Sequence, residues 1–328
     1  MSAVLAKKNL DIEQEDLEVD VLAESYCRGF RRCLALRQDT SDGKYSDKLR
    51  EALRTYFQSY GLLEHPRFPE WWDHHLGSRV AHAFNVFIPW LEELAGSLDG
   101  KTILEIGCGT GSSTVALAAH AHSVTACDIH LPSLETARIR LIEDGLAHKV
   151  KLLTISPGLD ELTRLRESFD VIVLYGVLEH MLPEERTNLF RTIWDLLRIR
   201  GQIVLYETPN RLFLTDRHTT GLFGWSWLPP NWALRYGKWR GAFDESTDLA
   251  AMYRLGFGMT YWGLKDLLQS NEIKYEIRSK YVGGPVWRRA WLKLLTTFLR
   301  APQCAFAENI NLVIEKLETV ASQLSRGV

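Results

Sequence analysis

The stretch from residue 101 to residue 209 alternates short apolar runs with segments whose apolar residues recur at helical spacing. Such runs predict buried strands, and the segments between them predict helices that cover a sheet. The expected strands are 101–107, 123–129, 149–155, 169–175 and 201–209, and the expected helices are 112–121, 131–145 and 184–201. Because strands and helices alternate, the pattern indicates an α/β domain with a doubly wound, parallel sheet. Such a sheet binds ligands beyond the carboxyl ends of its strands.

The sequence before this domain predicts helices. Residues 1–20 are charged and without periodicity, and we interpret them as a mobile arm. Residues 21–100 are expected to form a helical extension. Apolar residues at helical spacing predict one helix within 46–63 and another within 79–98, which Pro89 would bend or end.

The main domain, residues 101–328, is expected to carry two insertions, at about 209–255 and 282–308. The first is rich in aromatic residues, and the second contains a basic amphipathic stretch at about 286–300. Long insertions late in such a sheet suit a lid over a substrate. The remaining expected elements are a helix at 259–273 and strands at 274–281 and 309–317.

The composition is that of an ordinary globular protein, with 46% hydrophobic residues, 24% charged residues and a net charge of −2. This balance argues against a dedicated nucleic-acid-binding protein. The five cysteines include no C-x-x-C pair, and we expect free thiols in a reducing cytoplasm. The N-terminal residues lack the apolar core of a signal peptide, and no apolar run is long enough to span a bilayer.

Residues 102–111, TILEIGCGTG, end a predicted strand with alternating glycines and a carboxylate before them. A triphosphate-binding loop requires a Lys after its last glycine, and none follows Gly111. A dinucleotide turn requires G-x-G-x-x-G, which Gly107 and Gly109 begin but Ser112 does not complete. Glu105 would repel a pyrophosphate and attract an ammonium group. S-adenosylmethionine carries an amino group and no phosphate, and its carboxylate can bind amides at the start of the next helix.

Two further motifs follow in order. Asp128 ends the next predicted strand and can accept hydrogen bonds from both hydroxyls of a ribose, although an acid there can also simply cap a helix. The block FDVIVLYGVLEH ends in Glu179 and His180. Together the motifs resemble a class I S-adenosylmethionine-dependent methyltransferase over roughly residues 100–210. The resemblance implies a Rossmann-like, seven-stranded sheet whose last strand is antiparallel, and S-adenosylmethionine as the cofactor. It assigns to the cofactor Glu105, Gly107, Cys108, Gly109, Gly111, Asp128, Ile129, Tyr175 and Glu179.

One position departs from the family pattern. Many members carry an acid after the third strand that meets the adenine amino group, but this sequence has Ile155 and Ser156 there. Either Asp160 or backbone groups would have to replace that contact.

Two histidines are candidates for the base that a hydroxyl acceptor requires. His180 follows the fourth predicted strand, and His218 lies in the polar segment TPNRLFLTDRHTTGL after the fifth. We favour His218, because its segment resembles that of methyltransferases found with polysaccharide and cell-surface glycan genes. Alternatively, Glu179 and His180 only shape their turn, and His218 is an ordinary loop residue. Asp216 and His218 could also share a metal, but two ligands on one loop are weak evidence, and we predict no metal.

The predicted acceptor site lies in the first insertion. Its candidate residues are Asn210, Arg211, Asp216, Trp225 and Trp227. The clustered tryptophans, which also include Trp232 and Trp239, can stack a sugar or an apolar ring, or can form only the core of a lid. The basic stretch at about 286–300 can lie on a membrane surface or cover its own sheet.

We therefore expect O-methylation of a sugar or glycan-like acceptor, which would be lipid-linked if the basic stretch contacts a membrane. A cytoplasmic location is expected, at the inner face of the membrane in that case. The alternatives are methylation of a small secondary metabolite or of a nitrogen atom, a nicotinamide-dependent oxidoreductase, and a cofactor-binding subunit without activity of its own.

Overall fold

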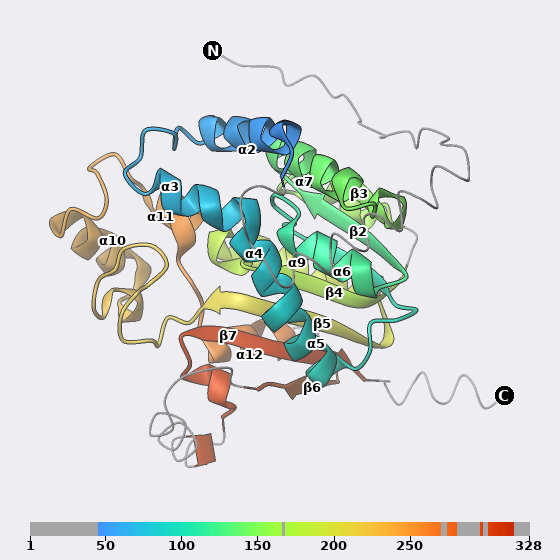
Figure 1. Ribbon diagram of the computed structural model, residues 1–328. Helices are drawn as coiled ribbons and strands as arrows, with labels where there is room; N and C mark the ends of the chain where they lie inside the picture. The colour runs from blue at the N-terminus through green and yellow to red at the C-terminus, as the bar shows by residue number, and fades with distance from the viewer. Residues whose placement is uncertain (1–44, 166–167, 270–273, 281–295, 298–300, 318–328) are drawn as a thin grey trace. The chain divides into compact units, whose positions relative to one another are not determined.

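The computed structural model describes residues 45–165, 168–269, 274–280, 296–297 and 301–317 (Figure 1). The expected arm at 1–20 and nearly all of the basic stretch at 286–300 lie outside the described residues. The chain divides into two compact units, which are described one at a time. Unit 1 comprises Met1–Pro89 and Leu98–Glu161, and unit 2 comprises Trp90–Ser97 and Leu162–Val328.

Helices form the first part of unit 1, as the apolar spacing predicts. Helix α2 (Asp47–Ser59) starts after Ser46, whose hydroxyl accepts a hydrogen bond from the Leu49 amide and caps the helix. It buries Leu49, Leu53 and Phe57. The segments that follow in unit 1 are α3 (Phe68–Asp73), the π-helical η2 (His74–Ser78), α4 (Arg79–His82) and the π-helical η3 (Ala83–Phe87). The next helix along the chain, α5 (Ile88–Ala95), belongs to unit 2 from Trp90 onward. Pro89 lies in the first turn of α5, where a missing amide is tolerated.

Unit 1 also holds three parallel strands with β2 in the middle. The strands are β1 (Thr102–Ile106), β2 (Ser123–Asp128) and β3 (Val150–Thr154). The helices that follow β1 and β2 are α6 (Ser112–His120) and α7 (Leu131–Glu143), and the short η4 (Ala147–Lys149) precedes β3. Helix α2 packs against α7 (Figure 1). The carboxyl ends of β1 and β2 thus bring the glycine segment and Asp128 to one edge of this sheet.

Unit 2 combines parallel and antiparallel strands. Strand β4 (Phe169–Tyr175) pairs in parallel with β5 (Leu197–Pro209), and β7 (Asn309–Lys316) pairs antiparallel with both β5 and β6 (Tyr275–Arg278). The short η5 (Leu178–His180) and helix α9 (Pro183–Leu196) connect β4 to β5. The predicted helix at 184–201 is too long, because β5 already begins at Leu197. Arg198 and Arg200 there form ion pairs with Asp170 of β4 and Glu315 of β7.

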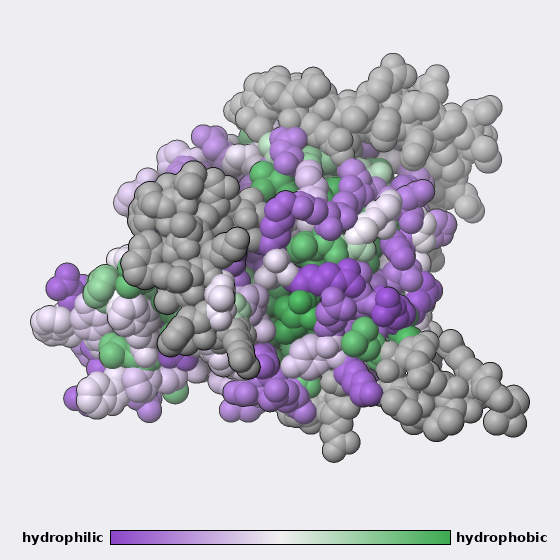
Figure 2. Space-filling model, turned by 90° about the horizontal axis from the view of Figure 1, so that it is seen from below, coloured by the Kyte–Doolittle hydropathy of each residue, from purple (hydrophilic) through white to green (hydrophobic). Residues whose placement is uncertain are grey.

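The strand order is β3-β2-β1-β4-β5-β7-β6 in one seven-stranded sheet. This order confirms the predicted α/β class and the antiparallel last strand. No helix within the described ranges is both long and apolar enough to cross a membrane. On the face shown in Figure 2, hydrophobic residues form separate patches among hydrophilic ones.

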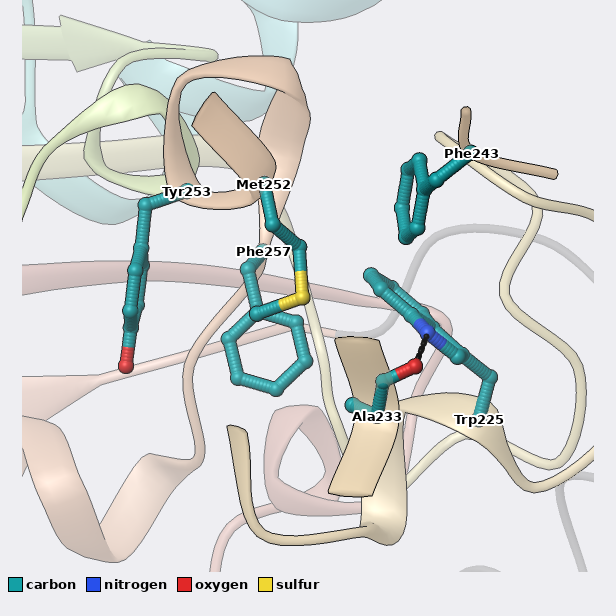
Figure 3. Packing of buried hydrophobic residues seen from close by; sticks show 6 residues of the cluster. All are labelled: Trp225, Ala233, Phe243, Met252, Tyr253 and Phe257. Carbon is teal, nitrogen blue, oxygen red and sulfur yellow. Dashed lines mark hydrogen bonds between the residues drawn. The ribbon is translucent and has the colours of Figure 1, made fainter. Parts of the chain in front are cut away.

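The first insertion folds around a tryptophan. Between β5 and β6 lie η6 (Trp225–Trp227), α10 (Pro230–Trp239), α11 (Leu249–Gly256) and α12 (Tyr261–Gln269). Trp225 is fully buried, and its indole N–H donates to the Ala233 carbonyl at 2.8 Å (Figure 3). Phe243 and Phe257 pack on its ring, with Met252 and Tyr253 in the same cluster. The insertion therefore has a hydrophobic core of its own.

Candidate functional site

The glycine segment of unit 1 is a tight loop between β1 and α6. Gly107, Gly109 and Gly111 have φ angles of 72°, 53° and 80°, a region that favours glycine. A Cβ on Gly111 would lie 2.8 Å from the Ala137 side chain, whereas nothing lies within 4 Å of one on Gly109. Gly111 therefore allows close packing on α7, and Gly109 leaves open space above the backbone.

Glu105 does not present its carboxylate at the surface. The residue is fully buried, and its two oxygens accept hydrogen bonds from Ser113 Oγ at 2.5 Å and Thr114 Oγ1 at 2.6 Å. Burial raises the pKa of this carboxyl. The interpretation that Glu105 attracts an ammonium group directly is therefore not supported by its position. Instead, the carboxylate holds the first turn of α6 in place. The first backbone hydrogen bond of this helix runs from the Val115 amide to the Gly111 carbonyl, and the amides at a helix N-terminus that come before such a bond can bind an anion.

Asp128 lies at the end of β2 beside this loop. Its Oδ2 accepts from the Gly109 amide at 2.8 Å, and its Oδ1 accepts from the His130 amide at 2.9 Å. Burial raises the pKa of the carboxyl. Each carboxylate oxygen has a second lone pair, so Asp128 can orient the loop and still accept hydroxyl groups. Its neighbour Ile129 is 58% exposed.

Two tyrosines at the end of α2, Tyr56 and Tyr60, lie against His130, two residues after Asp128, and sequence reasoning missed this contact. The rings of Tyr56 and Tyr60 lie 5.8 Å and 4.6 Å from the His130 ring, and Ser59 Oγ lies 3.0 Å from its Nε2. The negative charge of Asp128, after burial, helps to raise the pKa of Tyr60. The sequence predicts α2 from its amphipathic pattern. It does not predict the contacts of α2 with His130, because these residues are far apart in the sequence.

A buried arginine ties the glycine loop to the π-helical η2. Arg140 of α7 donates to the carbonyls of Thr110, Leu76 and His75 at 3.0, 3.1 and 2.9 Å. His75 Nδ1 also lies 3.3 Å from Thr110 Oγ1. π-Helical turns are frequent at functional sites. Contacts with both α7 and η2 therefore hold the loop in place.

The turn after β3, where Asp160 or backbone groups are expected to contact the adenine, also holds Glu161. The amide and the hydroxyl of Ser156 both donate to Glu161 Oε2 at 2.8 Å. The amide of Ile155 donates to the Asp128 carbonyl. Glu161, rather than Asp160, is thus the acid that meets this turn.

In unit 2, His180, His218 and Glu179 form one cluster. Both imidazole Nε2 atoms lie 3.9 Å from Glu179 Oε1, and the two rings are 5.3 Å apart. Glu179 is buried, while His180 and His218 are 43% and 34% exposed. The sequence presents these histidines as rivals, but the fold of unit 2 brings them together. Tyr175, at the end of β4, is buried and packs edge-on against Tyr206 at 4.9 Å.

Hydrogen bonds fix the tautomer of each imidazole. His180 Nδ1 lies 2.9 Å from the Arg254 carbonyl, which can only accept. His218 Nδ1 lies 3.0 Å from Thr219 Oγ1, whose own hydrogen is donated to the Gly256 carbonyl at 2.7 Å. Both Nδ1 atoms therefore carry the proton, and both Nε2 atoms keep a lone pair. Burial lowers the pKa of both histidines, which favours this neutral form.

Most predicted acceptor residues instead hold the insertion together. Asn210 Nδ2 donates to the carbonyls of residues 304, 305 and 307, and Arg211 donates to those of Ser226 and Leu228. Asp216 accepts from the amides of residues 218–220, and Trp225 is the core of the insertion. Trp227, at 46% exposed, is the predicted acceptor residue with an accessible ring. The other four hold the framework of the insertion together and also line the cavity described below, so their contact with an acceptor stays a prediction.

A polar cavity of about 170 Å³ lies beside this framework in unit 2. Its lining includes Glu207, Thr215, Arg217, His218, Glu308 and Asn309. Arg217 and Glu308 face each other across 3.4 Å. His218 thus belongs both to the cavity wall and to the cluster with Glu179.

Comparison with known proteins shows what part of the chain resembles. Residues 104–203 match the family model described as a methyltransferase domain. The ubiquinone biosynthesis O-methyltransferase of Pseudomonas paraeruginosa (strain DSM 24068 / PA7) is 32% identical over 142 residues, which cover 43% of this chain and 58% of the relative. That of Bordetella avium (strain 197N) is 33% identical over 143 residues, or 43% of this chain and 56% of the relative. The chain thus spans less than two thirds of these relatives.

Solved structures of methyltransferases also resemble the chain at low sequence identity. The S-adenosylmethionine-dependent methyltransferase SibL in its apo form aligns with a TM-score of 0.49 and 15% identity, covering 90% of this chain and 77% of that one. Magnesium protoporphyrin IX methyltransferase of Synechocystis PCC 6803, with bound SAH, aligns with a TM-score of 0.46 and 17% identity, covering 82% and 100%.

Proposed function

We propose that this chain, whose residues 104–203 match a methyltransferase domain, is an S-adenosylmethionine-dependent O-methyltransferase of a sugar or glycan-like acceptor. One observation carries the choice of a hydroxyl acceptor. His218 lines a polar cavity, and its Nε2 lone pair lies beside the Glu179 carboxylate. A hydroxyl must lose a proton as it is methylated, and a neutral imidazole at the wall of a cavity can accept it.

The residues of unit 1 fit the proposed cofactor. Open space above Gly109 lets a ligand approach the backbone, and Asp128 can accept hydrogen bonds from ribose hydroxyls beside it. The first amides of α6 can receive a carboxylate. When bound, S-adenosylmethionine supplies a methyl group on a positively charged sulfur.

In this proposal unit 2 handles the acceptor proton. A hydroxyl oxygen that receives this methyl group would have to lose its proton to a group of the protein. The hydroxyl proton passes to Nε2 of His218. Glu179 stabilises the imidazolium that results, because opposite charges in a buried site attract strongly.

The lining of the cavity supports a polyhydroxylated acceptor. Charged and amide side chains surround it, and such groups hydrogen-bond hydroxyls in several directions. Exposed aromatic rings on the same insertion, those of Phe223, Trp227, Trp232 and Trp239, can stack on the apolar face of a sugar. The names of the curated relatives favour a second candidate, a small hydroxylated aromatic compound.

Assays of the full chain with S-adenosylmethionine test this proposal. Oligosaccharides, catechols and primary amines are offered separately, and S-adenosylhomocysteine release is measured against a reaction without acceptor. We expect turnover with a saccharide. Turnover with catechols alone would transfer the assignment to the second candidate, and turnover with amines alone would refute O-methylation.

The His218→Ala variant tests the proton acceptor. It should lower kcat by about 10²-fold while cofactor affinity stays within about twofold, the usual size of a general-base effect. His180→Ala is the matched comparison, since that ring is equally far from Glu179 but is absent from the cavity lining. A large loss for His180→Ala with a mild one for His218→Ala would reverse the roles.

A further inference from the structure

The cluster of Glu179, His180 and His218 has the composition of a metal site. One ligand atom from each residue lies within 4.8 Å of the others. Two imidazoles and one carboxylate form a ligand set used by first-row divalent metal ions, with other coordination positions left open. From the sequence we predict no metal, and the pair weighed there, Asp216 with His218, is not this cluster, because Asp216 accepts from the amides of its own loop.

The hydrogen bonds around the cluster orient it as they do in metal sites. Metal-binding histidines usually donate their second ring N–H to a carbonyl or a similar acceptor, which turns the other nitrogen toward the ion. His180 donates to the Arg254 carbonyl, and His218 donates to Thr219 Oγ1. Gly256, with φ of 122°, packs directly on the His218 ring, where a Cβ would lie 2.4 Å from Nδ1. The rotation of both rings is therefore set by the fold of unit 2.

The electrostatics of the cluster also favour a cation. With the protons on Nδ1, the two Nε2 lone pairs and the Glu179 carboxylate are three acceptors that face one another. The guanidinium of Arg186, which interacts electrostatically with Glu179, donates its hydrogen bonds to the carbonyls of Met181 and Phe257. A positive ion between the three acceptors would convert their mutual repulsion into attraction.

We propose that Glu179, His180 and His218 bind one divalent cation of the zinc and cobalt class. Ligand atoms around a tetrahedral zinc ion lie about 3.4 Å apart, given metal–ligand distances of about 2.1 Å. The two carboxylate–imidazole separations of 3.9 Å would have to close by about half an ångström, and all three ligand atoms already lie within 4.8 Å of one another. The exposed sides of the two rings leave a path for the ion.

The role of this cation rests on the proposed function, whereas its binding does not. With the ion in place, the Nε2 lone pairs are coordinated, so the ion would replace His218 as the group that promotes loss of the hydroxyl proton. The base role of His218 given above applies to the metal-free chain. An open coordination position beside His218 would then receive the acceptor oxygen from the cavity and favour its ionised form. The site would accordingly select acceptors with an oxygen ligand over amines.

Cobalt(II) titration of the full-length, metal-free chain tests the site directly. We expect one equivalent of Co²⁺ to bind, with the visible absorption bands of a low-coordinate ion and displacement by Zn²⁺. Removing an outer-shell partner of a metal ligand typically costs about tenfold to 100-fold in affinity. Thr219→Val should therefore weaken binding to that extent, and Glu179→Gln, His180→Ala and His218→Ala should weaken it by at least as much.

The control is His122→Ala, which removes an exposed histidine of unit 1 and should leave cobalt binding unchanged. Circular dichroism and S-adenosylhomocysteine binding establish that each variant is folded. Failure of the wild-type chain to bind Co²⁺, or equal binding by the three ligand variants, would overturn the metal site. If the metal site is wrong but the proposed function is right, the chain will still bind the cofactor and turn over in the presence of a chelator. If the chain binds Co²⁺ but shows neither cofactor binding nor turnover, the proposed function is wrong and the metal site stands.

Discussion

Each glycine of the loop between β1 and α6 meets a different physical demand. Gly111 has a positive φ and lies against the Ala137 backbone, whereas Gly109 has a positive φ and open space. We predict that Gly111→Ala lowers the free energy of unfolding by about 2 kcal/mol or more, through strain and overpacking. Gly109→Ala should cost about 1 kcal/mol in stability, because only the φ angle is unfavourable, but should greatly weaken cofactor binding.

Thermal unfolding and calorimetry with S-adenosylhomocysteine separate these effects. If Gly109→Ala binds the cofactor as tightly as wild type, the space above that residue is not the place where the ligand approaches the backbone.

Asp128 is the residue most closely tied to the ribose in this account. We predict that Asp128→Ala weakens binding of S-adenosylhomocysteine by about 1–3 kcal/mol, since buried or charged hydrogen bonds are worth about that much. The control Asp99→Ala removes an exposed carboxylate of unit 1 and should have no effect on binding. An unchanged dissociation constant in folded Asp128→Ala would move the ribose contact elsewhere. Because Asp128 also accepts from the Gly109 amide, a modest loss of stability is expected as well.

At the scale of elements, the insertion after β5 contains one buried, structural tryptophan and one exposed tryptophan. Trp225 is fully buried and packs against Phe243 and Phe257 (Figure 3). Trp227, in contrast, is 46% exposed. Trp225→Ala should lower the free energy of unfolding by about 3–5 kcal/mol, as large-to-small core substitutions do. Trp227→Ala should change stability by less than about 1 kcal/mol and raise KM for the acceptor. If both variants lower stability equally and neither changes KM, Trp227 belongs to the hydrophobic core of the insertion and does not contact the acceptor.

The strands and most helices of this fold were predictable from sequence, because apolar periodicity reports burial along one element at a time. The runs ending in Glu105 and Asp128 were found at the correct places. The end of α9 was not, since β5 begins at Leu197 through pairing with β4, a strand that is distant in the sequence. The π-helical turns within 74–87 were equally invisible in a helical pattern.

The candidate site was predictable as a set of residues but not as a set of contacts. Motif spacing identified Glu105, His180 and His218, yet spacing cannot tell whether a polar side chain faces a ligand or its own fold. Glu105 turned inward onto Ser113 and Thr114, and the two histidines converged on Glu179. Such outcomes depend on tertiary packing, which a linear pattern does not contain.

For the whole molecule, a buried histidine predicts that stability depends on pH. Burial lowers the pKa of His75 well below its usual value of 6.5. The unfolded chain therefore binds a proton near pH 6.5 that the folded chain does not, so stability is complete above that pH and falls as the pH decreases toward the folded pKa. His75→Phe should flatten this decline, measured by chemical denaturation between about pH 7.5 and pH 5. His122→Phe serves as the exposed control, and an identical slope for wild type and His75→Phe would contradict the assignment.

The candidate residues are divided between the two units, with the glycine loop and Asp128 in unit 1 and the imidazole cluster in unit 2. The central claim is that the chain binds S-adenosylmethionine, and calorimetric titration of the full-length protein with S-adenosylhomocysteine and, separately, with NADH tests it most directly. We predict a single site with a dissociation constant in the micromolar range for S-adenosylhomocysteine and no detectable heat with NADH. Binding of NADH without binding of S-adenosylhomocysteine would contradict the account.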